Sequence, residues 1–193
     1  MPPKPKITKA MILRTVLEIT REMGFEAVNA RRIADRLCCS TRPIFTCYEN
    51  MDELKGDFLA YAFAYYSQYE KDYKKSKNAG AGLFHPLSYI EFAREETNLF
   101  RLLFISHMDL NMTEGGDFYR EPGNVEKAAA FSEEIGVLPE RGKRIFLNLF
   151  FYAHGIAVLT AAGKLSLDRG RCEAMLAEFL SAYTGGEKEG RIQ

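Results

Sequence analysis

Hydrophobic residues recur at helical spacing along nearly the whole chain, and no segment alternates in the manner of a β-strand. The first apolar stripe begins after Thr8, a good N-cap residue, and stops at Gly24, a good C-terminal residue. Two short helices follow, with Asn29 and Ser40 as their expected N-caps and Pro43 in the first turn of the second one. The pattern therefore predicts an all-α fold that starts with three short helices.

Longer helices are expected after these three. A fourth helix begins near Asn50, where acidic residues suit the positive end of a helix, and it extends to about Lys75. Glycines, a proline and polar residues predict a loop at 111–123. The other expected helices are 86–107 with a kink at Thr97, 124–135, 139–163, and a last one to Gly185 capped by Ser166 or Asp168. The chain thus divides into a small domain, residues 1–50, and a helical body, residues 51–193.

Charge divides the chain at nearly the same place. The 26 basic and 26 acidic residues give a net charge of zero, which by itself argues against a nucleic-acid partner. Residues 1–47, however, carry +5 and the rest of the chain −5. A basic segment on an acidic body is typical of proteins that bind nucleic acids or membrane surfaces, although chance clustering also produces it.

Cysteine spacing and hydropathy bear on the compartment. The four cysteines have no C-x-x-C spacing and follow no signal peptide, so we expect reduced thiols in a cytoplasmic protein without a metal site. The longest apolar stretch, 145–162, is shorter than a usual membrane span and contains Asn148 and His154. We expect it to be a buried helix and not a membrane segment.

The first fifty residues have the organisation of a helix-turn-helix. The second and third helices are separated by a tight turn, Ala34 is small enough for a close crossing, and Ile33 and Ile44 are apolar at the contact. In this motif the first residues of the second helix reach base edges, which directs Thr41 and Arg42 outward. Arg42 can donate two hydrogen bonds to a guanine, worth roughly 1 to 3 kcal/mol of discrimination. A solvated or phosphate-bound arginine is the alternative.

Neighbouring residues extend this surface. Arg31, Arg32 and the helix start at Asn29 lie where phosphates would pass, although arginines of this kind are often ordinary surface residues. Phe45 can touch a thymine methyl group or pack on the DNA backbone.

At this point a family resemblance is clear. The run NARRIADRLCCSTRPIFTCYENMDELK, preceded by Gly24 and Phe25, resembles the DNA-binding segment of the TetR family of transcriptional regulators. The resemblance covers about residues 8–58, and weaker similarity continues at 91–104 and 150–163. It implies an all-helical homodimer with an N-terminal helix-turn-helix and a ligand-binding C-terminal domain, paired through its last two helices.

The run also departs from the family pattern. Cys38 stands where the tight turn commonly has glycine, so a strained or altered turn is expected. Cys47 replaces a common histidine, and Met51 replaces a common lysine near the DNA backbone, a role for which Lys55 is the nearest substitute. The predicted DNA-binding residues are Asn29, Arg31, Arg32, Ser40, Thr41, Arg42, Pro43, Phe45, Cys47, Tyr48 and Lys55.

Tyrosines at 61, 65, 69 and 73 recur every four residues and so share one helical face. Core packing is the usual reason for such a stripe, but four hydroxyl groups need partners when buried, which favours a partly polar cavity. Such a cavity suits an apolar or aromatic effector. The predicted pocket residues are Tyr61, Tyr65, Tyr69, Phe92, Phe100, Phe104, His107 and Phe150.

Catalysis has little support in the sequence, which contains no nucleophile elbow, phosphate-binding loop or clustered metal ligands. We therefore expect no enzyme, cofactor or metal. The favoured hypothesis is a ligand-responsive regulator, a repressor rather than an activator, that binds a palindromic double-stranded DNA operator as a homodimer and is released by a small-molecule effector. The alternative is a helical protein-interaction module without specific DNA binding.

Overall fold

The structure is a computed structural model that describes residues 6–108, 111–121 and 123–185. All regular elements in these ranges are helical and none is a strand, which confirms the predicted all-α class. The helices form two compact units that divide within the long helix α4 (Met51–Ser76), after Tyr69. The domain boundary predicted after residue 50 coincides with the start of α4, whereas the two units divide further along this helix.

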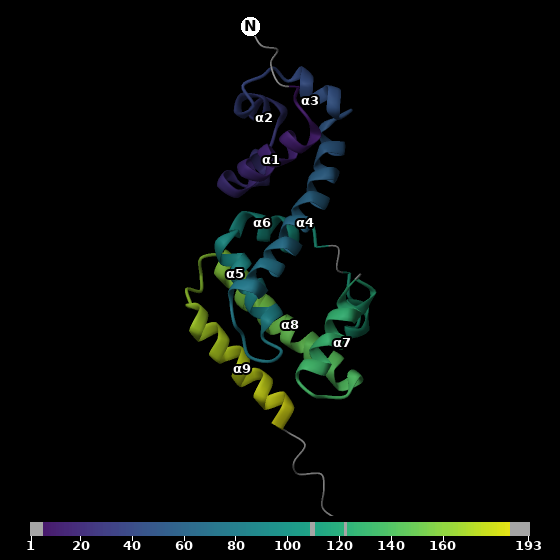
Figure 1. The fold of residues 1–193 in the computed structure, drawn as a ribbon, viewed down its shortest axis with the longest axis vertical. Helices are drawn as coiled ribbons and strands as arrows, with labels where there is room; N and C mark the ends of the chain where they lie inside the picture. Colours follow the sequence, from purple (N-terminus) through teal and green to yellow (C-terminus); the bar gives the residue numbers. More distant parts are fainter. Residues whose placement is uncertain (1–5, 109–110, 122, 186–193) are drawn as a thin grey trace, which may run out of the picture. The chain divides into compact units, whose positions relative to one another are not determined.

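The first unit comprises the described residues up to Tyr69 and a second segment, Glu96–His107. Figure 1 shows its helices α1, α2 and α3 at the purple and blue end of the chain. Its elements are α1 (Lys9–Met23), the 3-10 helix η1 (Phe25–Ala27), α2 (Ala30–Arg36), α3 (Arg42–Cys47), the first part of α4, α6 (Thr97–Arg101) and the π-helix η2 (Leu102–Ser106).

Helix α1 begins and ends as predicted. The Thr8 hydroxyl accepts a hydrogen bond from the Met11 amide at 3.3 Å, and this cap satisfies one of the free amides of the first turn. Gly24 ends the helix with a φ of 86°, a conformation that glycine adopts without a steric penalty. The apolar stripe is fully buried at Ile12, Val16 and Ile19, each burial being worth roughly 1.5 to 3 kcal/mol.

Helix α4 also follows its prediction. The Asn50 carboxamide oxygen accepts hydrogen bonds from the amides of Asp52 and Glu53, both at 2.9 Å, and so caps the helix. The row that packs into the first unit consists of Leu54, Phe58, Ala62 and Tyr66. These positions recur every four residues, which is why they share one face.

The second unit is arranged around one long helix, α8 (Pro139–Ala161), which packs against α5, α7 and α9. These helices appear in teal, green and yellow in Figure 1. The other elements of the unit are the end of α4, α5 (Phe84–Glu95), the 3-10 helix η3 (Gly115–Arg120), α7 (Asn124–Glu134) and α9 (Arg169–Gly185).

A glycine permits the close approach of α7 and α8. A Cβ atom on Gly142 would lie 1.8 Å from the hydroxyl oxygen of Ser132, so no other residue fits there without a shift of the helices. The Ser132 hydroxyl donates to the Ala128 carbonyl at 2.6 Å and is thus satisfied within α7. The contact therefore places no unpaired polar group in the core.

Several element boundaries differ from their predictions. Helix α5 starts two residues before Pro86, and the expected kink at Thr97 is an interruption at Glu96, the N-cap position of α6. The expected loop contains η3, because the Asp117 carboxylate accepts from the Thr113 and Glu114 amides at 2.8 and 3.0 Å. Position 122 of that loop lies outside the described residues. At α9, the cap is Asp168, which accepts from the Arg171 amide at 2.8 Å.

Helix α8 is long and apolar enough to cross a membrane by length and composition alone. Of its most apolar 18-residue window, 39% is buried within the protein. One such helix is weak evidence for a membrane span, because the core helix of a soluble protein has the same composition.

Candidate nucleic-acid interface

The start of α2 confirms the predicted cap and reassigns one arginine. The Asn29 side-chain oxygen accepts from the Arg32 amide at 3.0 Å. The Arg32 guanidinium donates to the Ala27 carbonyl at 2.8 Å, in the turn before the helix. Arg32 is half-buried there and stabilises this turn, and the phosphate contact predicted for it stays a prediction.

The turn between α2 and α3 is tight and contains the expected strain. The Cys39 amide donates to the Ala34 carbonyl at 3.0 Å, which closes the end of α2. Cys38 has a φ of 50° and is the one non-glycine residue with positive φ in the described ranges. This conformation costs a residue with a Cβ atom about 1 to 2 kcal/mol, consistent with glycine being the expected residue at this turn.

Ser40 does not cap α3, which corrects that prediction. The N-cap position is occupied by Thr41, whose side chain makes no capping hydrogen bond, while Ser40 is exposed one residue earlier. Pro43 lies in the first turn as predicted, where its missing amide hydrogen leaves no bond broken. Ile44 is completely buried and anchors α3 to the core of the unit.

The outward side of α3 carries two of the predicted contact residues. Arg42 is exposed at the first position of the helix, and Phe45 has 49% of its surface exposed. Cys47 is half-buried, with its thiol directed to the Ile7 carbonyl at 3.8 Å. The first turn of α3 therefore presents a cation next to an aromatic ring.

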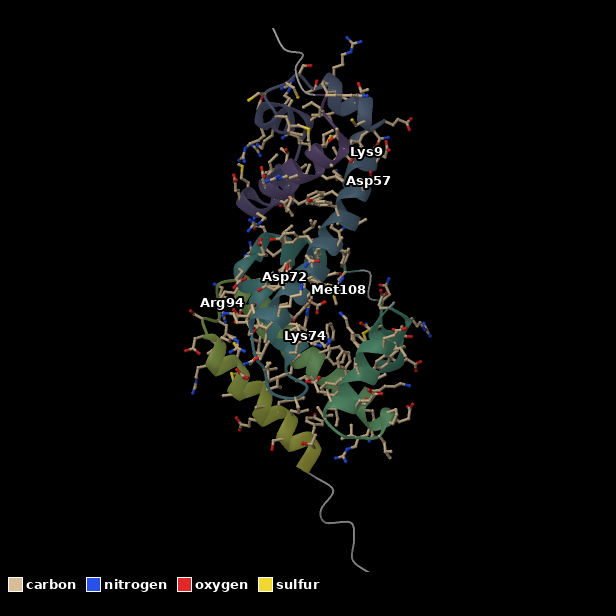
Figure 2. All side chains as sticks on the ribbon, in the orientation of Figure 1. Lys9, Asp57, Asp72, Lys74, Arg94 and Met108 are labelled. Atoms are coloured by element: carbon tan, nitrogen blue, oxygen red, sulfur yellow. The ribbon has the colours of Figure 1, made fainter. Side chains whose placement is uncertain are left out.

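Tyr48 belongs to the core and not to the exposed surface. Only 2% of it is exposed, and burial, with a smaller contribution from the Asp57 carboxylate, raises its pKa to about 12. The ammonium group of Lys9 lies 4.4 Å from the centre of its ring and contacts Asp57 at 3.2 Å and Glu53 at 3.4 Å. Figure 2 shows Lys9 and Asp57 facing each other. The sequence had placed Tyr48 at the DNA surface.

The cations of residues 6–55 fall into two groups. Arg36 pairs with Glu22, which lowers the pKa of that carboxyl group, and Lys55 lies 3.4 Å from Asp52. Arg31 and Arg42 are exposed, and their guanidinium groups make no hydrogen bond or ion pair with any described residue. These two arginines can therefore bind an external anion without breaking an internal pair.

The predicted pocket residues are divided between the two units. Tyr61, Tyr65 and Tyr69 are half-buried beside the fully buried row of α4, in the first unit. Phe100 is fully buried in the same unit. Phe104 has its ring centre 4.9 Å from that of Tyr66, a residue that the four-residue tyrosine repeat does not include.

The remaining three predicted pocket residues have separate surroundings. His107 is exposed and has an edge-to-face contact with Phe25, with ring centres 6.3 Å apart. Phe92 and Phe150 belong to the second unit, and Phe92 is completely buried there. Phe150 lies 4.7 Å from the ring centre of Phe118.

Beside Phe150 lies a polar pair that the sequence did not predict. The Tyr89 hydroxyl and Nδ1 of His154 are 2.9 Å apart, and the His154 ring stacks on Phe150 with centres 5.6 Å apart. Burial lowers the pKa of His154 and raises that of Tyr89. His154 is thus a hydrogen-bonded interior histidine, as its position on an apolar helix suggested. The partner comes from another helix, so no sequence spacing reveals the pair.

A pocket of about 390 Å³ occurs in the first unit. It lies between the end of α1 and the segment α6–η2, and no residue of the predicted set lines it. Its lining residues are Met23, Gly24, Phe25, Glu26, Asn98, Arg101, Leu102, Ile105 and Ser106.

Neither a metal site among the described residues nor a related protein identifies the chain. In the described ranges, no three histidine, cysteine, aspartate or glutamate side chains are grouped to hold a metal ion. No protein-family model and no curated protein sequence matches the chain.

Proposed function

We propose that the protein is a DNA-binding transcriptional regulator of the TetR type, with α2 and α3 as its helix-turn-helix and α3 as its recognition helix. We further propose that it acts as a repressor on a palindromic operator. The observation that carries this proposal is the first turn of α3, where exposed Arg42 lies beside half-exposed Phe45. A guanidinium and an apolar ring are suited to guanine edges and thymine methyl groups.

The state of the cations supports the same function. Arg31 and Arg42 have no internal partner among the described residues, while Arg36 and Lys55 pair with acids. Because residues 1–47 have a net charge of +5, phosphate attraction and side-chain readout act on the same part of the chain.

Half-buried and exposed apolar residues on α8 and α9 support a homodimer. Tyr152 stacks on Phe179 with ring centres 4.8 Å apart, and Phe179 stacks on Tyr183 at 4.6 Å. Phe151 and Leu159 on α8 are 49% and 47% exposed. Large apolar residues that remain exposed on two helices favour association. A dimer would present two recognition helices, which must be about 34 Å or a multiple apart to bind one face of DNA.

Release by a small effector follows from the same dimer geometry. A ligand that binds better to a dimer with another spacing of its recognition helices shifts the population away from DNA. We propose an apolar or aromatic effector, because both units contain clusters of aromatic rings with tyrosine hydroxyl groups, and the cluster of the second unit includes the half-buried His154.

Selection of duplexes from a random DNA pool tests the proposed function. We expect the purified protein to enrich a palindromic sequence, and its affinity for random duplex DNA to fall steeply with salt concentration. The double-logarithmic slope should be close to −0.9 for each phosphate neutralised. Binding that is absent, or independent of salt, would contradict DNA binding and favour a protein-interaction module.

A further inference from the structure

Glu96 is a buried carboxylate at a junction of the chain. It follows Glu95, the last residue of α5, and occupies the N-cap position of α6. Only 7% of it is exposed. A buried carboxylate is costly unless its oxygens are paired and hydrogen-bonded, so its partners decide where the surrounding helices lie.

Three helices of the first unit meet at this carboxylate. From α1, the Arg21 guanidinium makes two contacts, Nε to Oε2 at 2.7 Å and Nη2 to Oε1 at 2.7 Å. From α4, the Tyr65 hydroxyl donates to Oε1 at 2.8 Å. We call Arg21, Tyr65 and Glu96 the Glu96 network.

The geometry of the Glu96 network is demanding. A bidentate arginine fork requires both of its nitrogens to face the carboxylate, and the tyrosine must approach the same oxygen from another helix. Asn98 adds a bond from α6 to α1, since its side-chain amide donates to the Arg21 carbonyl at 3.0 Å. A small displacement of α1 relative to α4 or α6 would therefore break several charge-assisted bonds together.

The position of α1 matters for DNA binding because α2 packs against α1, and α3 follows α2 after a tight turn and buries Ile44 in the same unit. We propose that Glu96 is a positioning residue, which holds α1 against α4 in the orientation that α3 needs on DNA. This inference rests on the proposed function.

Three variants test the proposal. Glu96→Gln removes the charge, Tyr65→Phe removes one hydrogen bond, and Glu18→Gln is the matched control on the exposed Arg14 pair of α1. Binding is titrated on the duplex selected by the wild-type protein and on a random duplex of equal length. Amide hydrogen exchange is followed in α1 and α6.

We expect Glu96→Gln to lower affinity for the selected duplex by roughly tenfold and affinity for the random duplex much less. Tyr65→Phe should have a smaller effect of the same kind, and Glu18→Gln none. Exchange should become faster in α1 and α6. A merely structural role would lower both affinities equally, since it would reduce only the fraction of folded protein.

The outcomes are distinguishable from failure of the proposed function. If the wild-type protein binds DNA and both network variants keep its selected-to-random ratio, the positioning role is wrong and the proposed function stands. If amide hydrogen exchange in α1 and α6 were the same in Glu96→Gln as in the wild-type protein, the network would not hold these helices together, whatever the DNA titration shows. If the wild-type protein binds no DNA, the proposed function fails and the positioning role fails with it.

Discussion

Two arginines of α2 and α3, the proposed helix-turn-helix, are used in the opposite way to two arginines of the second unit. Arg31 and Arg42 are exposed and make no side-chain bond to any described residue. Arg94 donates to Glu91 and to the Leu167 carbonyl, both at 2.5 Å, and Arg169 donates to the Tyr73 hydroxyl at 3.1 Å. Figure 2 labels Arg94 in the second unit. The same residue type is thus available to an external anion at the first two positions and makes internal cross-links at the other two.

The comparison explains why net charge alone is a poor guide to function. An arginine that already donates to internal acceptors binds a phosphate weakly, because turning to the phosphate would leave a partly buried carboxylate or carbonyl group without its hydrogen bond. Arg94 and Arg169 therefore contribute to formal charge but not to an anion-binding surface. The proposed DNA binding therefore rests on where cations without an internal partner lie, here Arg31 and Arg42 in the first turns of α2 and α3.

The largest effect is expected in the second unit. Arg94→Ala leaves the Glu91 carboxylate, with 10% of its side chain exposed, without its charged partner and removes the bond to the Leu167 carbonyl. We expect the free energy of unfolding to fall by roughly 3 kcal/mol, the lower end for breaking a buried pair because Arg94 is about one-third exposed. Urea denaturation measures this loss.

Duplex affinity provides the control for Arg94→Ala. Corrected for the folded fraction, it should equal that of the wild-type protein. A stable Arg94→Ala protein with weakened DNA binding would break the comparison, because it would make Arg94 part of the binding surface.

Arg42→Ala should have the complementary effect. We expect affinity for the selected duplex to fall by about 1 to 3 kcal/mol, while the free energy of unfolding changes by less than about 0.5 kcal/mol. If Arg42 reads a base, discrimination at one base pair is lost. If it contacts a phosphate, affinity falls uniformly and the salt slope decreases by about one. Titrations on single-base variants of the duplex separate these outcomes, and unchanged affinity would exclude both roles.

Local features of the first unit were largely predictable from sequence. Thr8, Gly24, Asn29 and Asn50 act on backbone groups within a few residues, so their roles follow from residue type and position. The prediction that Ser40 caps α3 is wrong, because Thr41 occupies the N-cap position and the helix starts one residue later. Two adjacent residues of similar capping preference leave the boundary undetermined.

Features that depend on distant residues were not predictable. Tyr48 was assigned to the surface by its place in the motif, but it is 2% exposed and Lys9, 39 residues earlier, lies over its ring. In the first unit the buried row of α4 is shifted by one position from the stripe of tyrosines and includes Tyr66, whereas Tyr73 of the stripe is buried in the second unit. Periodicity gives the direction of a face, whereas the neighbouring helices decide which row is buried.

The turn before α3 differs from the other turns with positive φ. Glycine adopts this conformation at Gly24 in the first unit and at Gly82, Gly123, Gly136 and Gly163 in the second, whereas Cys38 adopts it before α3. Cys38→Gly removes a penalty of about 1 to 2 kcal/mol and adds about 0.5 to 1 kcal/mol of chain entropy. We expect a net gain in the free energy of unfolding of up to about 1 kcal/mol, measured by urea denaturation.

Cys38→Ala is the matched control for Cys38→Gly, because alanine lacks the thiol but retains the Cβ atom. It should give no gain. An equal gain from both variants would assign the strain to the sulfur and not to the backbone.

The smallest effect concerns His154, an interior polar group with no counterpart on the α3 surface. Burial lowers its pKa, so below the ordinary value of about 6.5 the unfolded chain binds a proton that the folded chain resists. This contribution to stability is present above that value and is lost as the pH falls towards the lower folded pKa. His154→Gln removes the titration and keeps an acceptor for Tyr89. Between pH 7 and 5.5 the wild-type protein should therefore lose up to about 1 kcal/mol more unfolding free energy than the variant. If the unfolding free energies of the two proteins changed in parallel with pH, protonation of His154 would not destabilise the folded state. The second unit would then accommodate a charged side chain without an acidic partner, as the α3 surface does.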